Sequence, residues 1–344
     1  MRPSLRRCLQ AVARPPPAFV FDIDGVLIRG PSVLPAAKRA LAILEGDNPF
    51  KVKLPYILLT NGGGVSERYR SEKLTRQLGF KIEPEQYIQA HTVLKTLSHK
   101  YHDSPVLVLG GKLDQVRQVA IDYGFQKALT PLDVLSWNPS VWPFHQLNPS
   151  EQASTLPIDF SQTRIPAIFV FHDPRNWALD IQIICDVIQS AGYIGGPHVP
   201  LHQQKNPVEL VFCNPDLLWK SDFPVNRLGQ GAFKAAFQGV FEGLTGSQYP
   251  CTQFGKPTKA TYDFAAHVLQ ERLHKMNGHA GRIYMIGDNP DSDIAGANAA
   301  KWESVLVRTG VFAAGTTPSH QPTHEVQDVE EAVSWAIARE FNGF

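Results

Sequence analysis

The chain has 344 residues, and its 33 lysines and arginines nearly balance its 32 aspartates and glutamates, so the formal net charge is +1. This balance gives no electrostatic reason to expect a nucleic acid as partner. A hydrophobic content of 43% and a charged content of 19% are typical of a folded globular protein, and no apolar run is long enough to cross a bilayer. The length suggests two domains, or one core with a large insertion. The four cysteines form no C-x-x-C pair, so we expect neither a zinc site nor a disulfide framework.

Residues 1–17 have the pattern of a mitochondrial targeting segment. Four arginines are the only charged side chains before Asp22, and apolar residues recur between them at helical spacing. An arginine-rich, amphipathic start without acidic residues is typical of transit peptides. Pro15-Pro16-Pro17 would end any helix that precedes it. We therefore expect an import signal at residues 1–17; the alternative is a basic tail without fixed structure.

Strand and helix signals alternate along residues 18–98 and again along residues 249–344. Short apolar runs indicate buried strands, and amphipathic stretches indicate helices. The expected strands are 19–21, 56–59, 282–286 and 304–307, and the expected helices are 34–45, 66–78, the stretch from Pro257 to about residue 273, and 329–340.

Residues 99–248 differ in character and are predicted to form a second, α+β module inserted into the first. Strand signals occur at 105–109, 168–171 and 208–213, and a helix signal occurs at 179–190. Residues 137–163 are rich in Trp, Pro, Ser and Asn. That stretch is too long for an ordinary connection, so we expect a functional or disordered loop there.

Three of the expected strands end in polar sequence that contains glycine, and a fourth polar position precedes a helix. The residues concerned are Asp22 and Asp24, Thr60 and Asn61, Asp288 and Asp293, and Lys256. The carboxyl ends of parallel strands lie along one edge of a sheet, which is where open α/β sheets bind their ligands. We therefore expect these side chains to converge.

This set of side chains suits phosphoryl transfer assisted by Mg²⁺. The ion takes oxygen ligands, usually one or two carboxylates together with water and substrate phosphate, and Asp22 and Asp288 can supply the carboxylates. A carboxylate such as that of Asp22 can also attack phosphorus and form an aspartyl-phosphate. Thr60 and Lys256 can orient the phosphoryl oxygens, and the backbone N–H groups of residues 61–64 can form an anion cradle.

Asp24 is the candidate general acid and base. It follows Asp22 by two residues, so on an extended strand it lies on the same face. From there it can protonate the leaving oxygen and then deprotonate the attacking water. Repulsion between neighbouring carboxylates favours a protonated form for one of them.

Each of these signals has a simpler explanation when it is taken alone. Asp24-Gly25 and Thr60-Asn61 are common turn sequences, and an isolated lysine such as Lys256 is usually a solvated surface residue. The acidic run at 291–293 lacks the later ligands of a calcium-binding EF-hand loop. Gly62-Gly63-Gly64 does not match the dinucleotide-binding fingerprint, which leaves dinucleotide binding as a weak alternative. The functional interpretation depends on the four positions occurring together, in this order.

Taken together, the motifs resemble those of the haloacid dehalogenase (HAD) superfamily. The matching positions, from the first motif to the fourth, are Phe21-Asp22-Ile23-Asp24-Gly25-Val26, Thr60, Lys256, and Gly287-Asp288 with Asp293. The insertion between the second and third motifs, with Asn214-Pro215-Asp216, is similar to the NagD-like class IIA members. Residues 287–294 and 308–312 resemble the cat eye syndrome critical region family of mitochondrial hydrolases. The resemblance covers nearly the whole chain after the leader.

The resemblance implies an α/β fold in which residues 18–98 and 249–344 form a Rossmann-like, doubly wound parallel sheet. Residues 99–248 would form the inserted α+β cap of class IIA, also called C2. The implied activity is a Mg²⁺-dependent phosphatase that acts on a small phosphorylated metabolite through an aspartyl-phosphate. The implied location is the mitochondrial matrix, with a possible link to glycerophospholipid metabolism as a further expectation.

The resemblance also assigns a role to each candidate residue. Asp22 and Asp24 would be catalytic, and Thr60, Asn61 and Lys256 would bind the substrate phosphate. The metal would be held by Asp22, Asp24 and Asp288, with Asp293 supporting it from behind. A homodimer through the cap is a further expectation.

One feature departs from many class IIA phosphatases. Gly62-Gly63 stands where those proteins have a second Asn and a Ser, so their substrates do not transfer directly to this chain. A cap over the site predicts a small phosphate ester as substrate. The balanced charge and the lack of a long apolar run predict neither a nucleic acid partner nor a transmembrane segment. Two alternatives remain: a catalytically idle scaffold with the same fold, and a protein that binds a phosphate-bearing ligand without turning it over.

Overall fold

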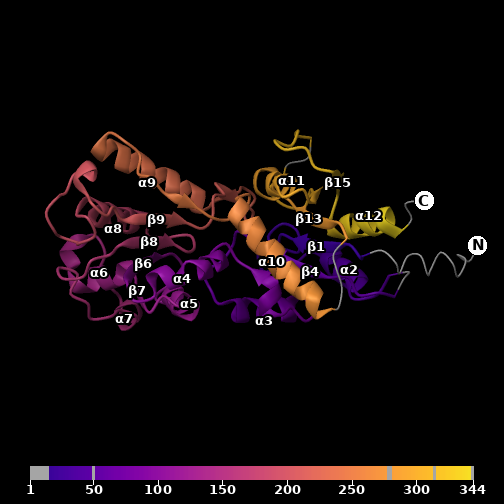
Figure 1. Ribbon diagram of the computed structural model, residues 1–344, viewed down its shortest axis with the longest axis horizontal. Helices are drawn as coiled ribbons and strands as arrows, with labels where there is room; N and C mark the ends of the chain where they lie inside the picture. The colour runs from indigo at the N-terminus through magenta and orange to yellow at the C-terminus, as the bar shows by residue number, and fades with distance from the viewer. Residues whose placement is uncertain (1–14, 49–50, 277–280, 313–314, 342–344) are drawn as a thin grey trace, which may run out of the picture.

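The computed structural model describes residues 15–48, 51–276, 281–312 and 315–341. Most of the predicted targeting segment lies outside these residues, so that prediction is not tested by the structure. The described chain forms two lobes along the long axis of the molecule, each built around its own sheet, and both chain ends lie at the same lobe (Figure 1).

The lobe that carries the chain ends is built on a six-stranded parallel sheet. Its strands are β1 (Ala18–Phe21), β4 (Tyr56–Leu59), β5 (Tyr87–Ile88), β13 (Ile283–Gly287), β14 (Glu303–Val307) and β15 (His324–Val326). Their order across the sheet is β15-β14-β13-β1-β4-β5, and every pairing is parallel. The chain therefore builds outward from β1 on one side and then from β13 on the other. This is the doubly wound Rossmann order, and its switch point lies between β1 and β13.

Helices cover both faces of this sheet, which explains why its strands are apolar throughout rather than alternating. They are α2 (Pro35–Leu44), α3 (Glu67–Leu78), α10 (Lys259–Lys275), α11 (Ala295–Ala299) and α12 (Val329–Phe341). Phe19 and Phe21 of β1 pack with α2, α3 and α12 on one face, whereas Ala18 and Val20 pack with α10 and α11 on the other. The expected strands and helices of this lobe are confirmed with small differences at their ends.

The other lobe holds a second parallel sheet. Its strands are β6 (Pro105–Leu109), β7 (Lys127–Leu129), β8 (Ala167–Val170), β9 (Glu209–Phe212) and β12 (Thr252–Gln253), in the order β12-β9-β8-β6-β7. Its main helices are α5 (Gln115–Tyr123), α6 (Pro131–Trp137), α8 (Trp177–Gln189) and α9 (Gln230–Thr245). All described pairings in this sheet are parallel and its strands alternate with helices. The α/β fold class is thus confirmed, and the inserted module is itself α/β rather than the α+β arrangement that we expected.

Short elements complete the described chain. They are the hairpins β2 (Ile28–Arg29) with β3 (Ser32–Val33) and β10 (Leu218–Trp219) with β11 (Arg227–Leu228), the helices α4 (Ser98–Tyr101) and α7 (Pro149–Ala153), the 3₁₀ turns η1 (Pro84–Gln86), η2 (Thr92–Thr96), η3 (Pro139–Val141) and η4 (Leu201–Gln203), and the π-helical turn η5 (Pro290–Ile294). Strand β12 lies beyond residue 248 but pairs with β9, so the second sheet extends a few residues past the predicted boundary.

Residues 137–163 are folded, so of the functional or disordered loop that we expected, the disordered alternative is wrong. They contain η3 and α7, and Asn148 caps α7 by accepting hydrogen bonds from the backbone N–H groups of Ser150 and Glu151. Phe160 is fully buried in the core of the inserted lobe. None of these residues lines the cavity between the two lobes, so their position gives no support to a direct role in choosing the substrate there.

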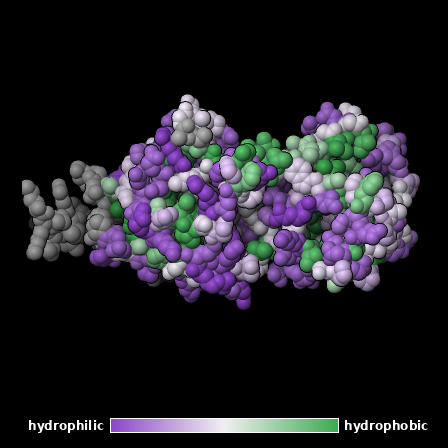
Figure 2. Space-filling model, turned by 180° about the vertical axis from the view of Figure 1, so that it is seen from behind, coloured by the Kyte–Doolittle hydropathy of each residue, from purple (hydrophilic) through white to green (hydrophobic). Residues whose placement is uncertain are grey.

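The face of the molecule shown in Figure 2 is mostly polar, with some hydrophobic area where the two lobes meet. The hairpin of β10 and β11 contributes exposed apolar side chains, including Trp219 and Leu228. Among the described residues, no helix has both the length and the apolar character needed to span a membrane.

Candidate active site between the two lobes

A cavity of about 370 Å³ lies between the lobes, at the carboxyl ends of both sheets. Core residues that follow β1, β4 and β13 form one side of it, and residues that follow β8 and β9 form the other. All seven residues that the sequence singled out, from Asp22 to Asp293, are among its lining residues. The convergence expected from the strand ends is therefore what the structure has.

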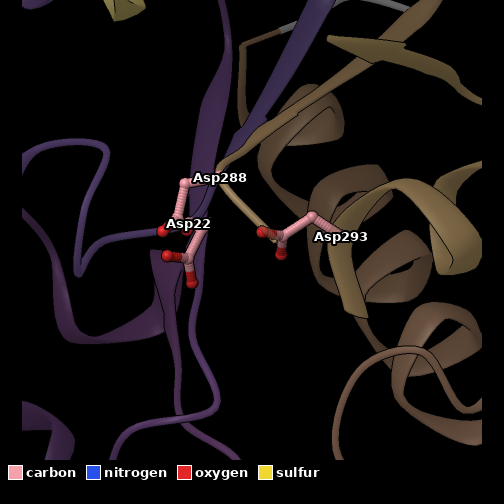
Figure 3. A group of neighbouring side chains, drawn as sticks. All are labelled: Asp22, Asp288 and Asp293. Carbon is pink, nitrogen blue, oxygen red and sulfur yellow. The ribbon is translucent and has the colours of Figure 1, made fainter. Parts of the chain in front are cut away.

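Three carboxylates form the floor of this cavity. One oxygen each from Asp22, Asp288 and Asp293 lies within 4.8 Å of the others, and all three residues are buried. Figure 3 shows the carboxyl groups turned toward a common space. Asp22 follows β1 and Asp288 follows β13, so the cluster sits at the switch point of the core sheet, while Asp293 reaches it from η5. The carboxylate of Asp24 is not part of this cluster.

Lys256 is the positive charge within the cluster. Its Nζ atom donates to Asp22 Oδ1 at 2.5 Å and to Asp293 Oδ1 at 2.6 Å. Burial alone would lower the pKa of Lys256, but the two carboxylates raise it well above its usual range, so the ammonium stays charged. Because an ammonium has three donors, one N–H remains for a further acceptor.

The backbone around Gly25 allows the carboxylates to come so close. Gly25 has a φ of +99°, and a β-carbon there would lie 2.5 Å from Asp288 Oδ2. Only glycine adopts this conformation readily and also leaves room for the carboxylate. The same oxygen accepts a hydrogen bond of 2.6 Å from the backbone N–H of Val311. The absence of a side chain at Gly25 therefore leaves the space that the Asp288 carboxylate occupies.

The donor set of this cluster fits a divalent cation. Burial raises the pKa of Asp22 well above its usual range, opposed by Lys256 and reinforced by Asp293. Burial and the Asp293 carboxylate raise the pKa of Asp288 to about 8. Three buried carboxyl groups face one ammonium, and their raised pKa values mean that ionising all of them calls for more positive charge than Lys256 supplies. Oxygen atoms in this arrangement are the ligands that Mg²⁺ prefers.

Asp24 and Thr60 flank the acidic floor. Burial raises the pKa of Asp24, against the opposing charges of Arg70, Lys256 and Lys73, which favours a carboxyl group able to donate a proton. The Thr60 hydroxyl oxygen accepts a hydrogen bond of 2.9 Å from the backbone N–H of Gly62. Its own proton remains available to a ligand in the cavity.

The Asn61 side chain is fully engaged within the protein. Its Oδ1 accepts from the backbone N–H of Lys256 at 2.8 Å. Its Nδ2 donates to the backbone carbonyl of Lys256 at 3.1 Å and to Asp216 of the inserted lobe at 3.0 Å. Asn61 thus positions Lys256 and joins the lobes, and any contact with a substrate phosphate falls to its main chain.

Two histidines explain the glycines that follow Asn61. A β-carbon on Gly63 would lie 2.6 Å from His91 Cδ2, and one on Gly64 would lie 2.4 Å from His172 Cδ2. The backbone N–H of Gly64 also donates to His91 Nε2 at 2.9 Å. Two imidazole rings therefore fill the space beside Gly63 and Gly64, whereas a β-carbon on Gly62 would come within 3.2 Å of Thr60 Oγ1.

Several cavity residues escaped the sequence analysis. Most of these residues come from three segments: Tyr69, Arg70 and Lys73 of α3; His172, Asp173 and Arg175 after β8; and Leu218, Trp219 and Lys220 of the inserted lobe. The run from His172 to Arg175 follows a buried strand, which is the same signal that identified Asp22. In an α+β module the carboxyl ends of the strands do not share one edge, so the α+β prediction gives no reason to place these residues in the site.

Two family models match the chain. A model described as haloacid dehalogenase-like hydrolase matches residues 19–126, and one described as HAD-hydrolase-like matches residues 253–332. A mitochondrial hydrolase of Saccharomyces cerevisiae is 39% identical over 346 residues, which cover 94% of this chain and 96% of the relative. The chain belongs to the haloacid dehalogenase-like hydrolases.

A second relative is a larger protein. The cardiolipin synthase (CMP-forming) and mitochondrial hydrolase fusion protein of Schizosaccharomyces pombe is 39% identical over 327 residues. The match covers 93% of this chain and 53% of that protein, so the chain spans about half of its length.

Solved structures with the same fold share little sequence with this chain. A hypothetical protein from Pyrococcus horikoshii has a TM-score of 0.63 at 19% identity, covering 93% of this chain and 99% of that one. A possible sugar phosphatase from Cytophaga hutchinsonii has a TM-score of 0.64 at 17% identity, covering 91% and 93%. A p-nitrophenyl phosphatase from Archaeoglobus fulgidus has a TM-score of 0.60 at 17% identity, covering 92% and 98%. At these identities the likeness concerns the fold.

Proposed function

We propose that this protein is a phosphatase that hydrolyses a small phosphate monoester through an aspartyl-phosphate on Asp22. The observation that carries the proposal is the position of Asp22: it follows the central strand β1, it is held by Lys256 at 2.5 Å, and it stands at the floor of a cavity together with Asp288. A buried carboxylate fixed beside an ammonium is suited to attack phosphorus, because the same positive charge attracts the phosphoryl oxygens.

Each further residue has a role in this scheme. The free N–H of Lys256 and the hydroxyl of Thr60 orient the phosphoryl group, together with the main chain of Asn61. Asp24 gives its proton to the leaving oxygen, and its carboxylate then takes a proton from the water that attacks the phosphoenzyme. The raised pKa of Asp24 supports the first of these steps.

We infer that Mg²⁺ is the cofactor. Asp22, Asp24 and Asp288 would hold it, with Asp293 supporting the group from behind. When bound, the ion offsets the charge of the ionised carboxylates and withdraws charge from the phosphoryl oxygens. The closeness of the three buried oxygens supports this proposal.

We also propose that residues 99–248 act as a cap that excludes water and limits the size of the substrate. The lining of the cavity by Asp216 and Trp219, which face the core residues across it, supports this role. A homodimer through the cap stays a prediction.

The names of the two relatives support a mitochondrial location. We propose that residues 1–17 are the import signal and that the matrix is the compartment. The fusion of a hydrolase to cardiolipin synthase in Schizosaccharomyces pombe motivates the proposal that the substrate belongs to glycerophospholipid metabolism. Loss of import after deletion of residues 1–17, followed with a fluorescent fusion, would support the first proposal; unchanged mitochondrial location would refute it.

The activity is tested by phosphate release from p-nitrophenyl phosphate with Mg²⁺. We expect turnover in the wild type, and a collapse of turnover in Asp22→Asn, because that change removes the attacking carboxylate and preserves its shape. Intact-mass spectrometry should detect a phosphorylated enzyme in the wild type and none in the variant. Folded wild-type protein that binds phosphate without turnover would favour a ligand-binding protein, and absence of both would favour an idle scaffold.

A further inference from the structure

Four basic side chains besides Lys256 line the cavity. They are Arg70 and Lys73 from α3, Arg175 after β8, and Lys220 after β10. Arg70 and Lys73 are three residues apart and therefore share one face of α3. Both act electrostatically on Asp24, which places them on the side of the general acid.

These four side chains make few polar contacts within the protein. Arg175 contacts His172 Nε2 at 3.2 Å, and Lys220 donates to the carbonyl of Pro224 at 2.9 Å. Arg70 bonds to the hydroxyl of Tyr87. Across the described part of the chain, no carboxylate lies within 4.0 Å of Arg70 or Lys73.

This situation is unusual for basic residues that line a confined cavity. On the same helix, Glu67 is paired with Lys95 at 3.2 Å, so α3 does form ion pairs where a partner is available. Arg70 and Lys73 are half-buried at the wall of the cavity, so their charged ends are accessible to a molecule that enters it. Among the described residues these two cations form no ion pair, and the carboxyl group on which they act is that of Asp24, whose raised pKa favours its uncharged form.

The phosphoryl group that is transferred does not account for them. It would sit on the acidic floor, where Lys256 and the proposed Mg²⁺ already supply positive charge. Arg70 and Lys73 stand beside Asp24, the residue that protonates the leaving group, so the part of the substrate that reaches them is the leaving group itself.

We propose that Arg70 and Lys73 bind a second anionic group of the substrate, so that the preferred substrates are small phosphate monoesters whose leaving group carries its own negative charge. This inference rests on the proposed phosphatase function. A cavity of about 370 Å³ can hold one small molecule that carries both anionic groups. The arginine fork and the lysine ammonium both recognise carboxylate and phosphate, so either group fulfils the requirement.

The test uses four esters that share a three-carbon chain and differ at its far end. Propyl phosphate ends in a methyl group, 3-aminopropyl phosphate in an ammonium, 2-carboxyethyl phosphate in a carboxylate, and propane-1,3-diyl bisphosphate in a second phosphate. We expect kcat/KM for the two esters with a second anion to exceed that for propyl phosphate by about tenfold or more, and the ammonium ester to be poorest. The carboxylate and bisphosphate arms then show which anion is preferred.

The variants assign the preference to the two side chains. In Arg70→Gln and in Lys73→Gln, the ratio of kcat/KM between the carboxylate ester and propyl phosphate should fall toward one, mainly through KM. Arg70→Lys keeps the charge and should retain part of the ratio. Arg68→Gln, an exposed position on α3 that does not line the cavity, is the matched control and should keep the wild-type ratio. Circular dichroism and Tm establish that each variant is folded.

Binding provides a readout that does not depend on turnover. The same four esters can be titrated by calorimetry into Asp22→Asn with Mg²⁺, and affinities should follow the same order. Equal affinities and equal kcat/KM values for the charged and uncharged esters would overturn the inference while leaving the phosphatase proposal intact. A preference that survives in both Arg70→Gln and Lys73→Gln would also overturn it. Absence of hydrolysis of any ester, with the affinity order retained, would instead count against the phosphatase proposal alone.

Discussion

His172 of the inserted lobe packs directly on Gly64 of the core. Gly64 has a φ of +94°, and a β-carbon there would come within 2.4 Å of His172 Cδ2 and 2.9 Å of its Cγ. Burial lowers the pKa of His172 to about 3, with help from the Arg175 charge, so the ring is neutral and the contact is one of packing. The pair therefore sets how closely the two lobes approach at the edge of the cavity.

The first prediction concerns this contact. Gly64→Ala introduces a side chain where the backbone conformation is strained for any residue except glycine, and where the His172 ring leaves no space. We expect the lobes to separate locally and kcat/KM on an aryl phosphate to fall by about tenfold or more, since misplacement by about 1 Å can cost 10²-fold. The measurement is steady-state kinetics together with Tm.

The matched control is Gly239→Ala in α9, where a β-carbon would meet nothing within 4 Å. That change should preserve activity and stabilise the helix by up to about 1 kcal/mol. Wild-type kinetics in Gly64→Ala would show that the close contact is not needed for the active arrangement.

The part of the site that the sequence predicts well lies at the ends of apolar strands. Strand β4 has the bounds that its apolar run indicates, and Asp22, Thr60 and Asp288 follow strands whose carboxyl ends share an edge. This prediction needs only the apolar run that marks each strand, which is a local signal, and the assumption that the strands are parallel. Lys256, which lines the same cavity, is predicted for a different reason: it stands just before a helix and matches a family motif.

Contacts between side chains that are far apart in the sequence cannot be predicted from such local signals. Asn61 bonds to Asp216, which is 155 positions away, and no local pattern indicates that the amide would serve this partner. The α+β prediction for the inserted module includes no helix over residues 230–245, where the structure has α9. A signal was present: Phe233, Phe237 and Phe241 recur every four residues and are all buried. The same sixteen residues contain three glycines, which disfavour a helix and so weaken the prediction of one.

The second prediction concerns metal binding. Titration with Mg²⁺ should raise the Tm of the wild type, because a ligand that binds only the folded state stabilises it in proportion to RT ln(1 + [L]/Kd). Asp288→Asn should reduce this increase strongly, since it removes one of three converging carboxylates. Asp263→Asn, an exposed position on α10, is the control and should respond to Mg²⁺ as the wild type does. An Asp288→Asn variant with the full wild-type response would place the ion elsewhere.

The third prediction concerns stability and pH at Asp180, far from the acidic floor. Burial raises the pKa of Asp180 to about 7, opposed only by the backbone N–H of Asn176, whereas its usual value is 3.8. The folded protein therefore binds more protons than the unfolded chain between about pH 4 and pH 7, and the stability linked to this group falls as pH rises through that range. Above it, the buried carboxylate is a net cost.

Asp180→Asn removes that dependence. Compared with the wild type, the variant should gain stability as pH rises, by at most about 1.4 kcal/mol per pH unit, and the gain should level off above about pH 7. Denaturant unfolding at several pH values measures it, with Asp122→Asn on the exposed face of α5 as the control. A stability difference that does not change with pH would contradict the prediction.

The last prediction concerns Asp24. Asp24→Asn leaves the nucleophile Asp22 in place but removes the group that moves the proton. General acid–base catalysis is worth about 10²–10⁴-fold, so a loss of that order in kcat is expected on an alkyl phosphate. On an aryl phosphate the loss in the first step should be smaller, because a good leaving group needs less protonation. Dephosphorylation would still be slow, since the same residue activates the water, so the phosphoenzyme should accumulate and be visible by intact-mass spectrometry. Equal losses on both esters, without a phosphoenzyme, would mean that Asp24 serves the structure of the site and not its proton transfers.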